Sequence, residues 1–179
     1  MQFRQSTISQ RYSIMVICNK VYKGCVDMSI SVHIQTILNG TITSLKSILP
    51  VPIEVKPPVV TSEPFEQEAM GVLIGIVGDL RGRVIIDGLP TTFSAIAEKM
   101  FGMAIDGEML ESFTGEFGNM IVGNLCTFVG QQNMTLDITP PTVMVGKTKL
   151  YGFQKAFSLP ATIEGAGNIT ILLTIDDDE

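Results

Sequence analysis

Two long stretches of the chain repeat apolar residues every three or four positions, which is the spacing of an amphipathic helix. The first begins at Met28 and ends before Pro50. The second opens after Asp106, a candidate N-cap, and runs to Val129, where a glycine ends it. These patterns predict two long helices, each with one apolar side. The apolar positions of the first are Ile30, Ile34, Ile37, Leu38, Ile42, Leu45 and Leu49.

Shorter segments around the long helices predict strands and one further helix. Residues 51–60 are rich in β-branched residues and proline, which suits a strand at a sheet edge. A short helix is expected over 91–101, with Gly102 in the C-cap position. Alternating and β-branched residues predict the remaining strands: a hairpin of 70–77 and 83–87 around the turn 78–82, followed by 142–145, 152–159 and 168–175.

The order of these elements predicts one α/β domain of the α+β type with a faint two-fold internal repeat. A long helix followed by three strands occurs twice. With an offset of 80 residues, Asn39 coincides with Asn119, whereas Thr36 stands where the second half has Glu116. If the halves are related, only the second retains this carboxylate.

Length and composition agree with a single domain. The 179 residues, 45% of them hydrophobic, suffice for one core and not for two. No apolar run approaches the roughly 18–20 residues of a membrane span, and no signal-peptide pattern is present, so a cytoplasmic protein is expected. The cysteines Cys18, Cys25 and Cys126 lack CxxC spacing, and His33 is the only histidine. Neither a disulfide framework nor a metal site is therefore expected.

Charge is distributed unevenly along the chain. Residues 1–27 sum to +3 and, because the whole chain carries −6, residues 28–179 carry −9. So acidic a domain is a poor nucleic-acid binder and favours a partner with a positive patch. We interpret 1–27 as a non-domain extension and 28–179 as the domain, because the charge changes sign and the periodicity is missing in 1–27. The Lys23-Gly24 pair, which a ribosome-binding site would encode, supports the same boundary. A flexible N-terminal arm is the alternative.

The second long helix carries the side chains with chemical potential. At about 100° per residue, Ser112, Glu116, Asn119 and Gly123 fall within roughly 60° of one another, opposite the phenylalanines. Glycines inside a helix each cost about 0.8–1 kcal/mol relative to alanine, which indicates that a backbone or a partner lies close. On pattern alone, an ordinary amphipathic helix with solvated polar residues remains the alternative. The glycines in question are Gly115, Gly118 and Gly123.

Two strings in this region resemble the signature of the CheC/CheX/FliY phosphatases of bacterial chemotaxis. The first is Ser112-x3-Glu116-x2-Asn119, and the second is the Asp-Ile-Thr-Pro-Pro-Thr-Val run that includes Pro141. The resemblance covers about 28–175. The family pattern places a proline 23 residues after the asparagine, and here that position is Thr142, a register difference of one residue. Since only one helix has both Glu and Asn, the chain resembles the CheX-like members.

The resemblance implies a CheC-like fold, with a largely antiparallel six-stranded sheet and long helices packed on it. It also implies a homodimer joined through sheet edges, and the apolar alternation of 168–175 points to that strand as the edge. Neither nucleic acid nor a membrane is an expected partner.

The activity implied by the resemblance is removal of the phosphoryl group from a phosphorylated CheY-like response regulator. Asn119 would orient the attacking water and Glu116 would pair with the receiver lysine, because phosphoryl transfer depends mainly on positioning and electrostatics. No cofactor on this chain is implied, since the Mg²⁺ belongs to the receiver. Partner contacts are expected at Ser112, Gly115, Gly123 and Pro141.

Two other functions remain open. One is a non-catalytic receiver-binding or flagellar-switch-associated module of the same superfamily. The other is an unrelated hydrolase with Ser112 or Cys126 as nucleophile, although no histidine base shares that helix face. The glycine-flanked segment 78–82 could suggest a phosphate loop, but a short link between two strands is better interpreted as a turn.

Overall fold

The computed structural model describes residues 28–176 except 68 and 154, with side chains described from residue 32 onward. The predicted extension at 1–27 lies outside the described residues. Three helices follow the predicted pattern: α2 (Met28–Ile48), α3 (Pro90–Phe101) and α4 (Gly107–Gly130). Gly102 ends α3 with φ 77°, as a C-cap glycine does. Asp106 is the N-cap of α4, but its carboxylate makes no capping hydrogen bond, and its backbone carbonyl accepts from Leu110 N–H at 3.2 Å.

The main sheet is antiparallel throughout and has eight strands, not the six that were expected. Its order is β1-β9-β10-β5-β4-β6, while β2 also pairs with β9 and β7 also pairs with β4. Each edge is thus shared by two short strands, so that eight strands fill six positions. The strands are β1 (Ile53–Val55), β2 (Val59–Thr61), β4 (Met70–Gly78), β5 (Gly82–Gly88), β6 (Leu136–Ile138), β7 (Thr142–Val145), β9 (Lys155–Ile163) and β10 (Gly167–Ile175).

Two predictions about the C-terminal strands were wrong. The last strand, β10, is not an edge, because it pairs with β9 on one side and β5 on the other. The strand predicted at 152–159 is β9, which continues past Pro160 to Ile163. Pro160 lies between the segment that pairs with β2 and the segment that pairs with β1, where its missing N–H breaks no ladder bond.

The internal repeat is visible in the sheet topology. If β1, β2, β4 and β5 are exchanged with β6, β7, β9 and β10, the sheet order reverses and is otherwise unchanged. The repeat also extends to sequence, since Ile53-Glu-Val-Lys-Pro-Pro-Val-Val-Thr61 aligns with Leu136-Asp-Ile-Thr-Pro-Pro-Thr-Val-Met144. The offset here is 83, because α4 has 24 residues and α2 has 21. A single offset of 80 therefore hides this part of the repeat.

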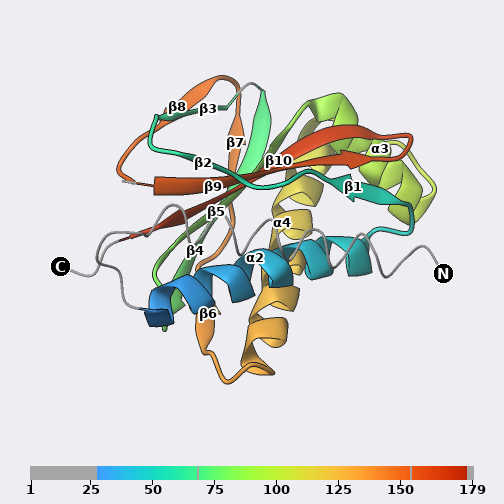
Figure 1. Cartoon of the computed structure of the whole chain (residues 1–179). Helices are drawn as coiled ribbons and strands as arrows, with labels where there is room; N and C mark the ends of the chain where they lie inside the picture. The colour runs from blue at the N-terminus through green and yellow to red at the C-terminus, as the bar shows by residue number, and fades with distance from the viewer. Residues whose placement is uncertain (1–27, 68, 154, 177–179) are drawn as a thin grey trace.

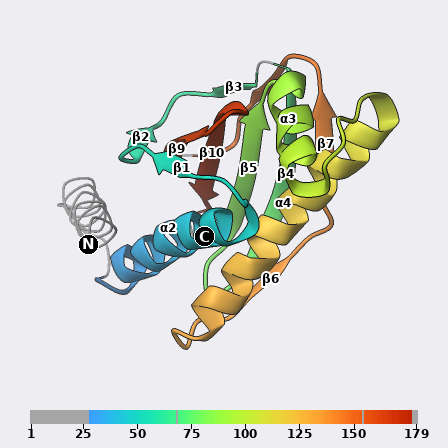
Figure 2. The same cartoon turned by 90° about the vertical axis from the view of Figure 1, so that its right-hand side faces the viewer.

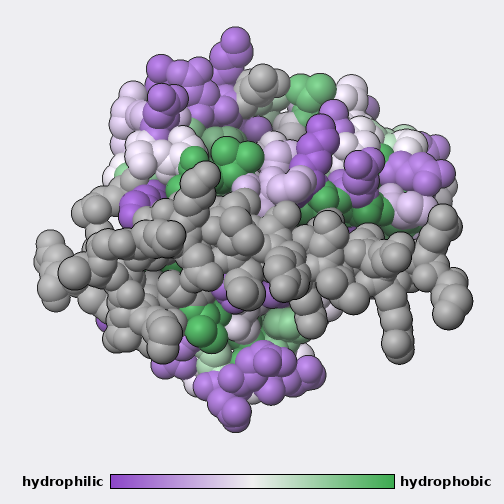
Figure 3. Space-filling model, viewed as in Figure 1, coloured by the Kyte–Doolittle hydropathy of each residue, from purple (hydrophilic) through white to green (hydrophobic). Residues whose placement is uncertain are grey.

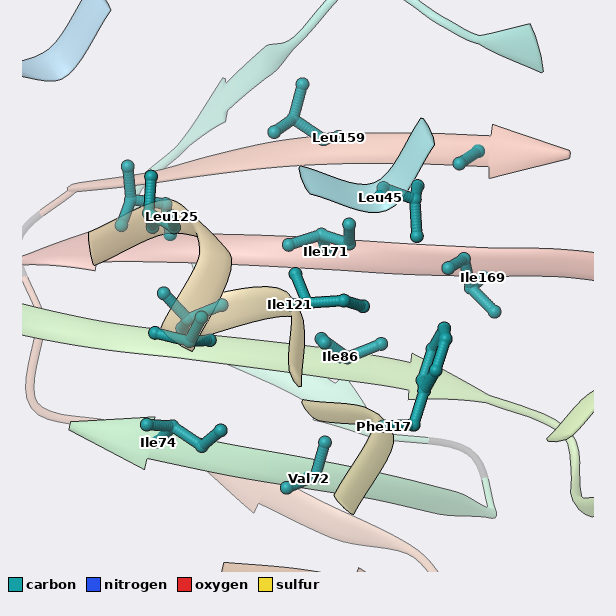
Figure 4. Packing of buried hydrophobic residues seen from close by; sticks show 14 of the residues in the cluster. Leu45, Val72, Ile74, Ile86, Phe117, Ile121, Leu125, Leu159, Ile169 and Ile171 are labelled. Atoms are coloured by element: carbon teal, nitrogen blue, oxygen red, sulfur yellow. The ribbon is translucent and has the colours of Figure 1, made fainter. Parts of the chain in front are cut away.

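Helices α2 and α4 pack on one face of the sheet and cross each other (Figure 2). Their crossing is close at Gly40, where a Cβ would lie 2.6 Å from Leu125 Cδ1 and 2.7 Å from Phe128 Cδ1. Side chains from both helices and four strands meet in the core between these layers (Figure 4). The residues labelled there are Leu45, Val72, Ile74, Ile86, Phe117, Ile121, Leu125, Leu159, Ile169 and Ile171.

The other face of the sheet is covered by a second, two-stranded sheet of β3 (Phe65–Gln67) and β8 (Thr148–Leu150), at the top left of Figure 1. It closes over Ile85, Ala156 and Leu172. On the face in Figure 3, outside the grey atoms, hydrophobic residues lie in small groups separated by hydrophilic ones. Within the described residues, no helix is both long and apolar enough to cross a membrane.

Candidate functional site on helix α4

Helix α4 is held against the sheet by aromatic and very small residues. The Phe117 ring is fully buried and contacts Phe93 edge-on, with centroids 6.2 Å apart, and Phe113 by stacking, at 5.8 Å. Gly118 brings the helix backbone close to β4, because a Cβ at this position would lie 2.5 Å from Val72 Cγ1. These contacts fix the rotation of the helix about its axis and therefore determine which side chains face outward.

The predicted stripe faces outward. Ser112 and Glu116 are exposed, and Asn119 and Gly123 are half-buried. A Cβ at Gly123 would meet no atom within 4 Å, so this glycine leaves open space beside the asparagine. Burial of the opposite side is confirmed for the phenylalanines at 113 and 117, whereas the phenylalanine at 128 is only half-buried.

The second string of the signature flanks the same helix. A Cβ at Gly115 would lie 3.1 Å from Val143 Cγ2 and 3.9 Å from Pro141 Cγ, so the absence of a side chain lets this segment approach α4. Thr139 holds the segment to β4, because its N–H donates to the Gly75 carbonyl at 3.0 Å and its hydroxyl accepts from Gly75 N–H at 2.9 Å. The role of Thr139 is not evident from the sequence, since it depends on a strand that is distant in the chain.

The structure thus brings all six predicted site residues to one side of α4. Glu116 and Asn119 are separated by three positions on the exposed stripe. Pro141 lies at the flank of the helix beside Gly115, one turn before Asn119. The helix has three glutamates and no lysine or arginine. An exposed carboxylate and a half-buried amide, side by side on an acidic helix, suit the recognition and orientation of groups on a basic partner.

The environment of the helix opposes a covalent mechanism. Burial raises the pKa of the Cys126 thiol, and the nearby Asp137 carboxylate raises this pKa further. The thiol is therefore less ionised at neutral pH than an ordinary cysteine, which makes it a weaker nucleophile. The only histidine of the chain, His33, lies on α2, so α4 offers Ser112 no base of this kind.

Local geometry identifies the glycine-flanked segment 78–82. Residues 79–81 form the turn between β4 and β5, and the Asp79 carboxylate there accepts from Thr135 N–H at 2.7 Å. The interpretation of 78–82 as a turn is thus confirmed. Within the part of the chain that the structure describes, no group of three or more His, Cys, Asp or Glu residues could hold a metal ion.

Comparisons with known proteins find similarity to chemotaxis phosphatases. Residues 70–152, which include α4 and the Pro141 segment, match the family described as "Chemotaxis phosphatase CheX". The chain is 24% identical over 146 residues to the CheY-P phosphatase CheX of Thermotoga maritima, covering 79% of this chain and 94% of that protein.

Solved structures share the fold. A CheC-like superfamily protein from Shewanella sp. PV-4 superposes with a TM-score of 0.69 at 20% identity, covering 79% of this chain and 98% of the other. The CheX–CheY–BeF3–Mg²⁺ complex from Borrelia burgdorferi contains a chain with a TM-score of 0.66 at 25% identity, covering 80% and 97%. The expected CheC-like α+β fold is confirmed.

Proposed function

We propose that this chain acts as a CheX-type phosphatase on a phosphorylated CheY-type receiver and that Glu116 and Asn119 carry this activity; its similarity to the chemotaxis phosphatases supports the proposal. The observation that carries the proposal is the outward stripe of α4, where the two side chains stand three positions apart on a helix locked against the sheet. Of the two long helices, only α4 has both residues.

Asn119 acts on the water. The receiver holds the aspartyl phosphate and Mg²⁺, as the composition of the Borrelia CheX–CheY complex suggests, and the asparagine amide orients a water in line with phosphorus. The water oxygen bonds to phosphorus while the bond to the aspartyl oxygen breaks, releasing inorganic phosphate and the receiver carboxylate. Partial burial of Asn119 limits the conformations of its side chain, and such preorganisation lowers the barrier.

Glu116 acts on the docking geometry. Its carboxylate is exposed and has no basic neighbour on its own helix, so it is able to pair with the receiver lysine that neutralises charge at the aspartyl phosphate. Gly123 leaves room for the partner backbone, Ser112 and Pro141 complete the rim of the contact, and the buried Gly115 contributes by letting the Pro141 segment approach α4. No cofactor on this chain takes part in any of these steps.

Self-association through sheet edges is a further part of the proposal. The main sheet has two edges available, since β10 is central. One edge is formed by β1 and β2, and the other by β6 and β7. Light scattering at micromolar concentration should give about twice the chain mass of 19.4 kDa. A mass of one chain at that concentration would remove the dimer from the proposal without affecting the catalytic assignment.

The test of function is decay of phosphorylated CheY in the presence of catalytic amounts of this protein. The chain has no tryptophan, so the tryptophan fluorescence of the receiver reports dephosphorylation directly. We expect multiple turnovers for the wild type and none for the Glu116→Ala/Asn119→Ala double variant. A wild type that binds the beryllium-trifluoride form of CheY without accelerating decay would instead support the non-catalytic binding module.

A further inference from the structure

An apolar corner lies where α3 meets α4. Phe101, Met103 and Met109 are 62%, 58% and 61% exposed, which makes them three of the most exposed large apolar side chains among the described residues. Three such side chains within nine positions are unusual on a surface that otherwise scatters its apolar residues. The structure also shows contacts that hold Phe101 and the connection after α3 in place.

The corner is preorganised by two contacts. The Phe101 ring stands edge-on to Phe113, with centroids 5.9 Å apart and planes at 86°. The connection that carries Met103 is tied to α3, because the Ser94 hydroxyl donates to the Ile105 carbonyl at 2.7 Å. Side chains that are already ordered lose little entropy when a partner covers them, so a fixed apolar corner is better suited to binding than a mobile one.

Met109 connects the corner to the stripe of α4. Met109 precedes Glu116 by seven residues, close to two full turns, so both side chains project from nearly the same side of the helix. The distance between them along the axis is about 10 Å, at about 1.5 Å per residue. A specific protein contact buries about 800 Å² on each partner, which corresponds to a radius of about 16 Å. A receiver centred on Glu116 and Asn119 therefore reaches Met109, and it is wide enough to reach Phe101, which contacts Phe113 three positions before Glu116.

We propose that the corner formed by Phe101, Met103 and Met109 is the part of the receiver-docking surface that sets affinity; this rests on the proposed function. Asp106, Glu108 and Glu111 are exposed beside it. The occupant is accordingly a receiver surface with an apolar centre and basic residues around it. The arrangement separates two tasks along α4: its first turns hold the partner, and the turn with Glu116 and Asn119 acts on the phosphoryl group.

The experiment measures binding and turnover separately. CheY loaded with Mg²⁺ and beryllium trifluoride is titrated with the wild type and with Phe101→Ser and Met109→Ser, and steady-state kinetics are recorded with phosphorylated CheY. Each variant should weaken binding about 5-fold to 30-fold and raise KM by a similar factor, with kcat unchanged. Phe101→Leu should bind nearly as well as the wild type, because it keeps the apolar surface.

Tyr151→Ser is the matched control. Tyr151 is 64% exposed, close to the 62% of Phe101, but follows β8 on the opposite face of the sheet, so its loss should not change binding. Binding within twofold of the wild type for both corner variants would overturn the proposal. If the corner variants have a lower particle mass than the wild type but the same affinity for CheY, the proposal is also overturned, since the corner would then contact a second copy of this chain. The proposed function is judged separately, by whether the wild type turns over at all.

Discussion

Helices α2 and α4 occupy equivalent places in the two halves of the molecule, yet only α4 has a complete site. Both have a half-buried asparagine at the corresponding position, Asn39 and Asn119. Where α4 has the exposed Glu116, α2 has Thr36, and where α4 has Gly123, α2 has Thr43. The duplicated fold thus supplies two platforms of the same shape. Under the proposed function, these two positions account for the activity of α4 and not of α2.

The flanking segments differ in the same way. Thr139 holds the Pro141 segment to β4 through two hydrogen bonds with Gly75. In the other half, Lys56 stands in the place of Thr139, and its N–H donates to the Pro160 carbonyl at 2.9 Å. Proline has no N–H with which to return a second bond. The half with Glu116 and Asn119 is therefore also the half whose flanking segment has the second hydrogen bond at this position.

The largest expected effect separates the two asparagines. Asn119→Ala should lower turnover of phosphorylated CheY by about 10²-fold or more, because the water loses its orienting amide. Affinity for the beryllium-trifluoride form should stay within a few-fold. Asn39→Ala, the matched change on α2, should leave turnover and affinity as they are. Initial rates at saturating receiver decide the point, and equal losses in the two variants would contradict a single site.

A second contrast concerns how tightly α4 is packed. Gly118→Ala places a methyl group only 2.5 Å from Val72 Cγ1. Because Val72 is buried in β4 and has few rotamers, we expect the free energy of unfolding to fall by about 1–3 kcal/mol. At Gly40 the same change meets the ends of Leu125 and Phe128, which can move more easily. Denaturant unfolding should therefore show a larger loss for Gly118→Ala than for Gly40→Ala, and the reverse order would mean that α2 is the more tightly fitted helix.

Glu116 should give an intermediate effect with a signature in salt. Glu116→Ala removes a charge partner from the receiver, so affinity should fall on the order of 5-fold to 10-fold at low ionic strength and less at high ionic strength. Thr36→Ala on α2 is the control and should change neither value. Affinities titrated across a range of NaCl concentrations test this. A loss that does not depend on salt would show that Glu116 acts through something other than charge.

The smallest expected effect lies at the open end of the stripe. Gly123→Ala introduces a methyl group that meets no atom within 4 Å, and alanine is the better helix former, so the free energy of unfolding should rise by about 0.5–1 kcal/mol. Affinity for the receiver should fall at the same time, because the open space beside Asn119 is filled. A variant that is more stable and binds equally well would exclude Gly123 from the contact. Thermal melts and receiver titrations report the two changes.

Periodicity predicts helices far better than it predicts this sheet. The outward stripe of α4 follows from spacing alone, because one side of the helix is buried and the other is not. Strand 168–175 suggested an edge, but Leu172 and Thr174 on its second side are buried as well. The sheet containing β3 and β8 and the helix pair cover opposite faces, so both sides of the central strands are enclosed. Three-residue strands such as β1 and β6 show no period, since they exist through distant partners.

The site was therefore predictable in its helical part only. Ser112, Glu116, Asn119 and Gly123 lie on one helix, so their common direction can be calculated from the sequence. The approach of Pro141 to Gly115 and the hydrogen bonds of Thr139 with Gly75 depend on tertiary contacts, and only the resemblance to a family linked the two strings. Met109 satisfies the same helical spacing as the predicted residues, and its exposure is what separates it from a core position.

The exchange of strands between the two halves has a consequence for how the chain folds. Strand β1 pairs with the end of β9, so Ile53 lies opposite Ile163, which is more than half of the chain length away in sequence. Strand β4 likewise pairs with β6 and β7 from the other half. Neither half can complete its own edge, because each borrows strands that are synthesised with the other. Pairings of this separation lose much chain entropy before they gain contacts, which places folding in the slow range for small domains. If the chain is cut between α3 and α4, the two fragments should each be unstructured alone and should recover the native sheet only on mixing, at a rate that depends on their concentration.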